Sequence, residues 1–351
     1  MDDCALNDAY HALIRGDRAG AVPTLQRAGL WTLSLGYRLG VDMRNWAFDH
    51  GWKAVHRVGV PVVSVGNLTV GGTGKTPCVE YVARFYRQLD LQVTLLSRGY
   101  GSEAGRNDEA LVLEENLPDV PHLQGADRAG LARVAVEELE SEILVLDDGF
   151  QHRHLHRDLD IVLIDATCPW GHGHLLPRGL LREPTGSLQR ADVVILTRCD
   201  LASAETVQGI RATVARIKPE LPMVESIHQP SEWRNAAQAV MSLETMNRRP
   251  IAGFCGLGNP DAFRQTLGKL GLNVIAWRTF PDHHRYSRSD IEEIRAWARQ
   301  LPAETAVVTT QKDLVKIRLD RLGDRELWAL AIRLEITSGQ DAFEECLRRI
   351  V

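Results

Sequence analysis

An apolar run that leads straight into a glycine-rich loop is the feature that most restricts the fold of this sequence. Val63–Pro77 reads VSVGNLTVGGTGKTP, and a helix is predicted to begin at Lys75 and Thr76. A strand that ends in glycines and opens a helix leaves successive backbone N–H groups free to surround phosphate oxygens. In such a loop the lysine reaches the β- and γ-phosphates and the threonine hydroxyl binds Mg²⁺. We therefore predict a phosphate-binding loop, or P-loop, made by Thr69, Val70, Gly71, Gly72, Thr73, Gly74, Lys75 and Thr76.

Apolar runs alternate with amphipathic helical segments along most of the chain, which is typical of a parallel sheet covered on both faces. The first series of runs occupies 61–65, 92–97, 142–148, 159–166 and 191–197. A second series follows the polar stretch 231–238, at 251–257, 272–280, 306–310 and 327–336. We predict an α/β fold with a P-loop NTPase-like parallel-sheet domain at 59–230, a smaller α/β domain at 245–351, and an N-terminal helical segment at 1–58.

Two adjacent acids end one of the predicted strands. Asp147 and Asp148 follow four apolar residues in EILVLDDGFQHR. One carboxylate is expected to hold the Mg²⁺ shell, and the other to orient the substrate or a metal-bound water. The sequence does not decide which acid takes which role. A helix cap is the alternative explanation, and it accounts for one aspartate better than for two.

Charge and cysteine content exclude several classes of protein. The 351 residues carry a net charge of −5 and no long Lys/Arg run, so we expect no nucleic-acid partner. The six cysteines form no C-x-x-C pair, which argues against a disulfide framework or a zinc ribbon. The acidic N-terminus has no apolar core typical of a secretory signal. No uncharged apolar run is long enough to span a bilayer.

The segment 26–59 combines tryptophans with leucines and basic residues. It contains Trp31, Trp46 and Trp52, together with interspersed arginines and lysines. Such a composition suits a helix that lies in a lipid interface, with rings and guanidinium groups at headgroup level. The segregation of the two kinds of residue is imperfect, because Arg38 falls near the Trp31 face. An N-terminal helix packed on the domain behind it is the alternative.

Nine motifs in order resemble those of the tetraacyldisaccharide 4′-kinase family, the kinases that phosphorylate a lipid A precursor. They are VGNLTVGGTGKTP, LLSRGYG, DEALVL, GADR, DDGFQHR, LLPRGLLREP, GFCGLGNP, FPDHHRY and TTQKDLVK, and they extend from the region of Trp31 to the C-terminal part. The chain departs from the family pattern at Ala110, Arg178 and Leu180. The resemblance implies transfer of the γ-phosphate of ATP to the 4′-hydroxyl of a tetraacyldisaccharide 1-phosphate, with ATP and Mg²⁺ as cofactors.

The resemblance also implies roles for residues that the pattern alone would leave as loop acids or loop histidines. Asp108 becomes the catalytic base, with His283 to orient it and relay the proton, while His284 remains a competitor of His283. Glu109, beside the base, joins Thr76 and Asp147 as a candidate metal ligand. Lys75, Asp147 and Asp148 complete the expected catalytic set.

Three arginines are candidate contacts to the acceptor, which carries a phosphate on its reducing sugar. Arg98, Arg128 and Arg182 follow predicted strands or open predicted helices on the nucleotide side of the sheet. Guanidinium groups bind phosphate bidentately. Any one of the three can instead be a surface ion pair.

Two other functions compete with that of a lipid kinase at the inner face of the cytoplasmic membrane. The run ILTRCD, which ends at Asp200, is close to the base-reading [NT]-K-x-D signature of P-loop GTPases. Arg198 in place of lysine, and the lack of an Asp-x-x-Gly switch after the acidic strand, count against a regulatory GTPase. A non-catalytic nucleotide-binding module that docks on membranes would have no use for both Asp108 and His283. We expect the lipid precursor and the membrane surface as partners, and no obligate protein partner.

Overall fold

The structure, a computed structural model, describes residues 3–99 and 108–351. Their chain forms two compact units. Unit 1 contains residues 3–99, 119–228 and 334–351, and unit 2 contains residues 108–118 and 229–333. These units follow packing in space and include segments from distant parts of the sequence. The domain ranges 1–58, 59–230 and 245–351 therefore stay a prediction.

Unit 1 is built on a parallel sheet in the strand order β7-β6-β5-β1-β4-β2-β3. The strands are β1 (Val62–Asn67), β2 (Val93–Ser97), β3 (His122–Gln124), β4 (Ile143–Asp147), β5 (Leu159–Asp165), β6 (Val193–Thr197) and β7 (Met223–Arg234). Every residue of β1, β2, β4 and β6 is buried, which explains their continuous apolar character. The predicted α/β class with a mostly parallel sheet is confirmed.

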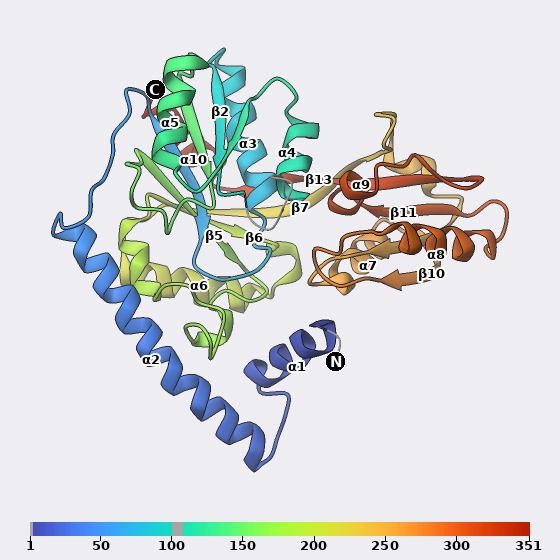
Figure 1. The fold of residues 1–351 in the computed structure, drawn as a ribbon, viewed down its shortest axis with the longest axis horizontal. Coiled ribbons are helices and arrows are strands. Elements are labelled where there is room, and N and C mark those ends of the chain that lie inside the picture. The colour runs from blue at the N-terminus through green and yellow to red at the C-terminus, as the bar shows by residue number, and fades with distance from the viewer. Residues whose placement is uncertain (1–2, 100–107) are drawn as a thin grey trace. The chain divides into compact units, whose positions relative to one another are not determined.

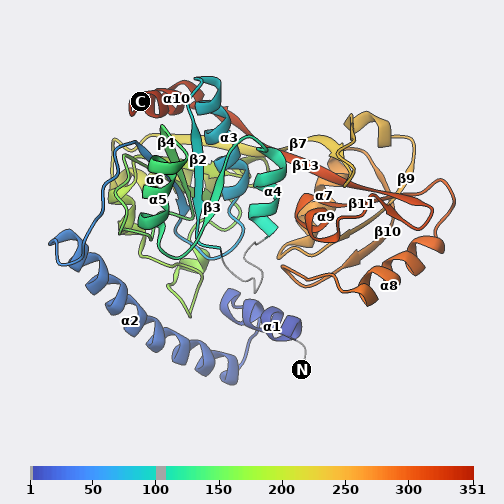
Figure 2. The same cartoon turned by 45° about the horizontal axis from the view of Figure 1, so that its top comes forward.

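Helices cover both faces of this sheet (Figures 1 and 2). They are α3 (Lys75–Gln88), α5 (Arg128–Glu138), α6 (Ala204–Ile217) and α10 (Gln340–Arg348). Helix α5 packs Ala132 and Ala135 against residues of β1, β2 and β4. Helix α6 packs Ile210 and Val214 against β5 and β6. Short 3-10 helices occur at η1 (Gly171–Gly173), η2 (Thr185–Arg190) and η3 (Cys199–Leu201).

The N-terminal part of unit 1 consists of α1 (Asp3–Arg15) and the long helix α2 (Ala21–Asp49). One side of α2 bonds to the segment 174–184: Ser34 Oγ donates to Leu175 O at 3.0 Å, and Tyr37 Oη donates to Arg182 O at 3.0 Å. Large apolar side chains on this helix and just after it remain exposed, namely Leu25, Trp31, Leu33, Leu35, Leu39, Met43, Trp46 and Trp52. The helix thus combines packing on its own domain with an exposed apolar surface. Within residues 3–99 and 108–351, no helix is long and apolar enough to cross a bilayer.

Unit 2 has its own parallel strands in the order β10-β9-β11-β13. The strands are β9 (Pro250–Cys255), β10 (Asn273–Thr279), β11 (Ala306–Thr310) and β13 (Arg325–Ser338), with the short antiparallel additions β8 (Val240–Met241) and β12 (Arg321–Leu322). Its helices are α4 (Asp108–Asn116), α7 (Pro260–Lys269), α8 (Arg288–Arg299), α9 (Gln311–Ile317) and the 3-10 helix η4 (Leu243–Met246). Strands β7 and β13 contribute residues to both units.

We predict that Gly66→Ala lowers the free energy of unfolding by about 1–3 kcal/mol, because a methyl group in β1 overpacks the sheet. Its Cβ would lie 2.6 Å from Phe150 Cβ and 2.7 Å from Phe150 N. Urea unfolding followed by circular dichroism measures the change. Gly186→Ala is the control, since nothing lies within 4 Å of its Cβ, and it should change stability by at most about 0.5 kcal/mol. Equal midpoints for the two variants would contradict the prediction.

Candidate active site

The predicted P-loop connects β1 to α3 at the carboxyl end of the sheet of unit 1. Gly71 and Gly74 have φ angles of 116° and 89°, which a residue with a side chain rarely adopts. Asn67, the fully buried last residue of β1, donates its Nδ2–H to Thr73 Oγ1 at 2.8 Å. The N–H of Val70 bonds to Leu180 O at 2.8 Å. The loop is therefore held by hydrogen bonds to its own strand and to the segment after Gly179.

Asp148 is held by cations on several sides. Arg182 forms a bidentate ion pair with it, through Nη1–Oδ2 at 2.9 Å and Nη2–Oδ1 at 2.7 Å. Lys75 Nζ lies 3.6 Å from Oδ1, and Arg128 Nη1 donates to the backbone oxygen of Asp148 at 3.0 Å. Burial opposes the charge, but the Arg182 hydrogen bonds and the nearby cations outweigh it and hold the pKa of Asp148 far below its usual range. Asp148 is thus a permanent anion at the P-loop lysine.

Asp147 ends β4 beside the P-loop strand, with Val65 of β1 as its register partner. Its carboxylate is buried, and its charge adds to the effect of burial in raising the pKa of the Cys78 thiol in the first turns of α3. Thr76, also buried, lies in the first turn of the same helix. A carboxylate and a hydroxyl near a P-loop are the hard oxygen donors that Mg²⁺ accepts, with phosphate oxygens and waters as its remaining ligands. Asp147 and Thr76 therefore fit a magnesium ion.

The structure brings the three predicted arginines into one neighbourhood. Arg98 follows β2 and is exposed, Arg128 begins α5 and is buried, and Arg182 lies in the segment after Leu180. Burial lowers the pKa of Arg128, the two aspartates raise it, and the positive charges of Arg98 and Arg182 lower it further. This concentration of positive charge beside the P-loop suits anionic phosphate groups.

The expected pairing of Asp108 with His283 is present within unit 2. Asp108 is the first residue of α4 and is buried, and the Nδ1 of His283 lies 2.9 Å from its Oδ2 and 3.1 Å from its Oδ1. His283 has a left-handed backbone, with φ 56°. His284 faces elsewhere: its ring stacks on Phe280, and its Nε2 lies 3.1 Å from Asp290 Oδ2. The geometry therefore favours His283 over His284 as the partner of Asp108.

Two lysines of α9, four residues apart, face the acids at the start of α4. Lys312 Nζ lies 2.6 Å from Glu109 Oε1, and Lys316 Nζ lies 3.7 Å from Asp108 Oδ2. The sequence prediction missed both, although their helical spacing within TTQKDLVK places them on one face. The ion pair to Lys312 occupies Glu109 in this structure, so the predicted metal role of Glu109 stays a prediction.

The charges of this cluster shift the pKa values of the pair in opposite directions. Burial opposes ionisation of Asp108, but the hydrogen bond from His283 and the two lysines outweigh it and lower its pKa from 3.8 to about 2. The hydrogen bond to Asp108 raises the pKa of His283 above 6.5, against burial. The contribution of His283 to the stability of the folded protein is complete below pH 6.5, and it is lost as the pH rises through the pKa of His283 in the folded state. The contribution of Asp108 to this stability is present above pH 3.8, and it is lost as the pH falls through about 2, the pKa of Asp108 in the folded state.

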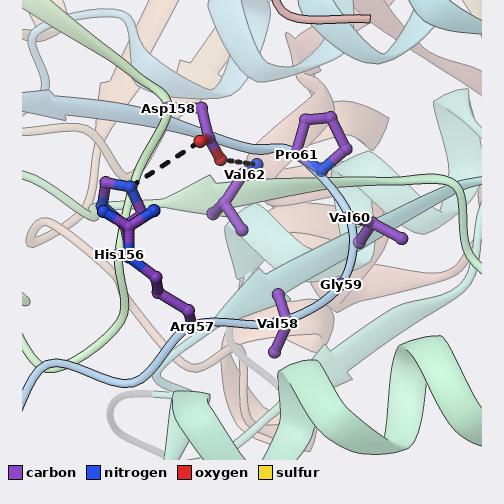
Figure 3. A pocket seen from close by; sticks show the side chains of 8 residues that line it. All are labelled: Arg57, Val58, Gly59, Val60, Pro61, Val62, His156 and Asp158. Carbon is purple, nitrogen blue, oxygen red and sulfur yellow. Dashed lines mark hydrogen bonds and ion pairs between the residues drawn. The ribbon is translucent and has the colours of Figure 1, made fainter.

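A hollow in unit 1 lies at the opposite end of β1 from the P-loop (Figure 3). Its cavity volume is about 240 Å³, and its lining includes Arg57, Pro61 and His156. Asp158 Oδ2 accepts the N–H of Val62 at 2.9 Å, and His156 Nε2 lies 3.7 Å from Asp158 Oδ1. The carboxylate thus satisfies the first N–H of the strand. Because ligands of open α/β sheets bind at the carboxyl ends of the strands, this hollow is not part of the candidate site.

We predict that the His283 imidazole titrates above its ordinary pKa and that Asp108→Asn lowers this pKa, because the amide removes the anion that favours the protonated ring. Two-dimensional NMR of the histidine side chains as a function of pH measures both values. Asp290→Asn, which removes the carboxylate beside His284, is the matched control and should leave the His283 titration in place. A His283 pKa that is the same in native protein and Asp108→Asn would contradict the pairing.

Comparisons with known proteins identify the family of the chain. Residues 26–351 match the profile of the family described as LpxK, tetraacyldisaccharide-1-P 4′-kinase. The chain is 38% identical over 357 residues to the tetraacyldisaccharide 4′-kinase of Anaeromyxobacter sp. (strain Fw109-5), covering 96% of this chain and 93% of that protein. It is 40% identical to the enzyme of the same name from Anaeromyxobacter dehalogenans (strain 2CP-C), covering 94% and 92%.

A solved structure is also similar. The crystal structure of the "apo" form of LpxK from Aquifex aeolicus in complex with ATP matches with a TM-score of 0.75 and 29% sequence identity, over 93% of this chain and 99% of that one. The likeness thus extends over most of the chain. The chain belongs to the tetraacyldisaccharide 4′-kinase family.

Proposed function

We propose that this protein transfers the γ-phosphate of ATP to the 4′-hydroxyl of a tetraacyldisaccharide 1-phosphate, giving the 4′-phosphorylated lipid A precursor. One observation carries the proposal: a chain of this family has a P-loop whose lysine pairs with Asp148 in unit 1, and a buried Asp108 paired with the exposed His283 in unit 2. Phosphoryl transfer to an alcohol needs a phosphate cradle and a proton acceptor. Unit 1 contains the proposed cradle, and unit 2 contains the proposed proton acceptor.

Unit 1 binds the nucleotide phosphates in this proposal. Backbone N–H groups of the P-loop surround phosphate oxygens, apart from those of Val70 and Thr73, which bond to Leu180 O and Gly71 O. Lys75 contacts the β- and γ-phosphates, as in other P-loop enzymes. Lys75 starts 3.6 Å from Asp148, so an arriving phosphate competes with that carboxylate for the ammonium group. Arg182 keeps Asp148 in place during the exchange, because its bidentate pair does not involve Lys75.

Asp147 and Thr76 are the residues that would hold Mg²⁺. An ion held by these two residues would supply positive charge to the phosphoryl group that is transferred. Asp147 is proposed as its carboxylate ligand rather than Asp148, since both oxygens of Asp148 already accept from Arg182. Asp148 is proposed to orient the cations around the phosphates.

Unit 2 accepts the proton of the attacking hydroxyl. A carboxylate with a pKa of about 2 is a weak base by itself, whereas the imidazole of His283, whose pKa Asp108 raises, is the stronger base of the two. The family resemblance implies Asp108 as the base, whereas we propose from these pKa shifts that Asp108 orients the hydroxyl and the His283 ring, and that His283 takes the proton. Lys312 and Lys316 keep Asp108 ionised, as their charges lower its pKa.

The lipid acceptor is proposed to bind along α2 and the arginine group. A hollow of about 390 Å³ lies between α2 and the segment 170–185, with Trp31, Leu35, Trp170 and Leu175 in its lining. Such apolar and aromatic walls suit the acyl part of the acceptor, while Arg98, Arg128 and Arg182 suit its phosphate. The exposed tryptophans and leucines of α2 support a peripheral position on the inner face of the cytoplasmic membrane.

A regulatory GTPase is the weaker candidate. The relatives that match are named as kinases, and the segment that resembles a base-reading motif bonds to the P-loop backbone through Arg198.

We predict that Lys75→Ala abolishes phosphate transfer to tetraacyldisaccharide 1-phosphate while the protein stays folded, because Lys75 supplies charge to the phosphates and Arg182 still pairs with Asp148. Transfer of ³²P from ATP to the purified lipid in mixed micelles is the measurement, with GTP in a parallel reaction and thermal unfolding as the folding control. Native protein should prefer ATP. A folded Lys75→Ala variant with near-native turnover would overturn the P-loop assignment.

A second prediction treats Asp108 and His283 as one unit. Asp108→Ala, His283→Ala and the double variant should lose turnover by similar factors, of about 10²–10⁴, because members of a catalytic unit are strongly non-additive. All three should still bind ATP, since neither residue belongs to the phosphate cradle. Turnover of the native protein should rise with pH as His283 loses its proton. Independent, multiplicative losses at saturating substrates would show that the two residues act separately, and His284→Ala should retain activity.

A further inference from the structure

The outer side of the P-loop is bonded to two consecutive residues at the end of β6. Thr197, the fully buried last residue of that strand, donates its Oγ1–H to Thr73 O at 2.9 Å. Arg198 follows and donates from Nη2 to Gly72 O at 2.7 Å. Two successive carbonyl groups of the loop therefore have donors from a strand that is not adjacent to β1, because β5 lies between them.

Arg198 is itself fixed in this position. Its Nη1 pairs with Oδ2 of Asp165, the last residue of β5. The other oxygen of Asp165 accepts the N–H and the Oγ1–H of Thr167, at 2.9 Å and 2.7 Å. Arg198 also has a φ of 57°, a left-handed conformation that costs energy in a residue with a side chain. The chain keeps this strained backbone at the point where it directs the guanidinium to the P-loop.

A third residue touches the loop from the same side. Gly74 is so close to His228 of β7 that a Cβ on Gly74 would lie 2.4 Å from His228 Nε2. Each residue of the loop from 72 to 74 is thus contacted by a residue of β6 or β7 or by Arg198 directly after β6. Position 74 requires a glycine for two reasons: its φ is 89°, and His228 leaves no room for a Cβ.

These bonds determine which way the peptide groups of the loop face. In a planar trans peptide the C=O and the N–H point in opposite directions. A C=O of Thr73 held by Thr197 therefore turns the N–H of Gly74 away from β6. A C=O of Gly72 held by Arg198 fixes the preceding peptide plane, whose N–H, that of Thr73, bonds to Gly71 O at 3.0 Å and tightens the loop. Binding by backbone N–H groups is stronger when their directions are set before the ligand arrives.

We propose that Thr197 and Arg198 are positioning residues that hold the P-loop in its phosphate-binding shape. The proposal rests on the nucleotide site of the proposed function and goes beyond it. The run TRCD, which resembles a base-reading signature, then serves the phosphates of the nucleotide and not its base. Any ligand with a diphosphate group should benefit from this bracing to the same degree.

Isothermal titration of ADP and of inorganic pyrophosphate, both with Mg²⁺, tests the proposal. Thr197→Val removes the hydroxyl at almost constant volume and leaves the Thr73 carbonyl without its donor, so both probes should bind about tenfold more weakly. Thr197→Ser keeps the hydroxyl and should restore binding to within about twofold of native. Arg198→Ala should weaken both probes by one common factor, with partial recovery in Arg198→Lys.

Thr309→Val is the matched control. Thr309 is also fully buried near a strand end, and its Oγ1 donates to Phe254 O at 2.9 Å, but it lies in unit 2. This variant should lower the unfolding temperature and retain both affinities. A structural role of Thr197 alone would instead make the two variants behave alike.

Lys75→Ala separates failure of this proposal from failure of the proposed function. If Lys75→Ala weakens both probes while Thr197→Val and Arg198→Ala bind them normally, the bracing role is wrong and the nucleotide site stands. Loss of ADP binding with unchanged pyrophosphate binding would identify a base contact and overturn the proposal. Unchanged binding in Lys75→Ala would remove the site on which the proposal rests.

Discussion

The bidentate ion pair between Arg182 and Asp148 is the interaction on which the nucleotide side of this molecule depends. Asp148 has a left-handed backbone and a carboxylate that is mostly buried, so it needs close cations. The next residue, the fully buried Glu183, forms ion pairs away from the P-loop. It pairs with Arg44 of α2 at 2.7 Å and with Arg190 at 2.9 Å. Two adjacent residues thereby connect the anion at the P-loop lysine to the long N-terminal helix.

This connection gives the exposed helix α2 a defined position relative to the site within unit 1. In addition to the pair with Glu183, helix α2 donates hydrogen bonds from Tyr37 to the backbone oxygen of Arg182 and from Ser34 to the backbone oxygen of Leu175. Arg153, from the segment after the acid pair, pairs with Asp49, the last residue of α2, at 2.6 Å. A surface that suits a lipid interface is thus anchored by the same segments that carry charges at the P-loop. An acceptor that lies along α2 would meet the arginine group without a flexible linker between the two.

The sequence predicted the elements that local patterns encode and missed those that depend on distant contacts. The apolar runs at 61–65, 142–148 and 191–197 became β1, β4 and β6, since a strand buried on both faces is apolar throughout. The pairing of Asp108 with His283 was expected only from the family resemblance, because the two residues are 175 positions apart. Packing of α4 in unit 2 brings them together, and no local pattern records it. The lysines of α9 and the bonds of Thr197 and Arg198 were missed for the same reason.

The charges at the P-loop leave a net positive site that suits phosphate. Lys75, Arg98, Arg128 and Arg182 outnumber the two acids of the pair, so an excess of positive charge remains. Asp148 neutralises part of it and keeps the cations from repelling each other. A nucleotide phosphate brings more negative charge than this one carboxylate, and it can bond to the loop N–H groups as well. In the proposed function, Lys75 would therefore move from Asp148 to phosphate, whereas the pair with Arg182 would be retained because its geometry already uses both oxygens.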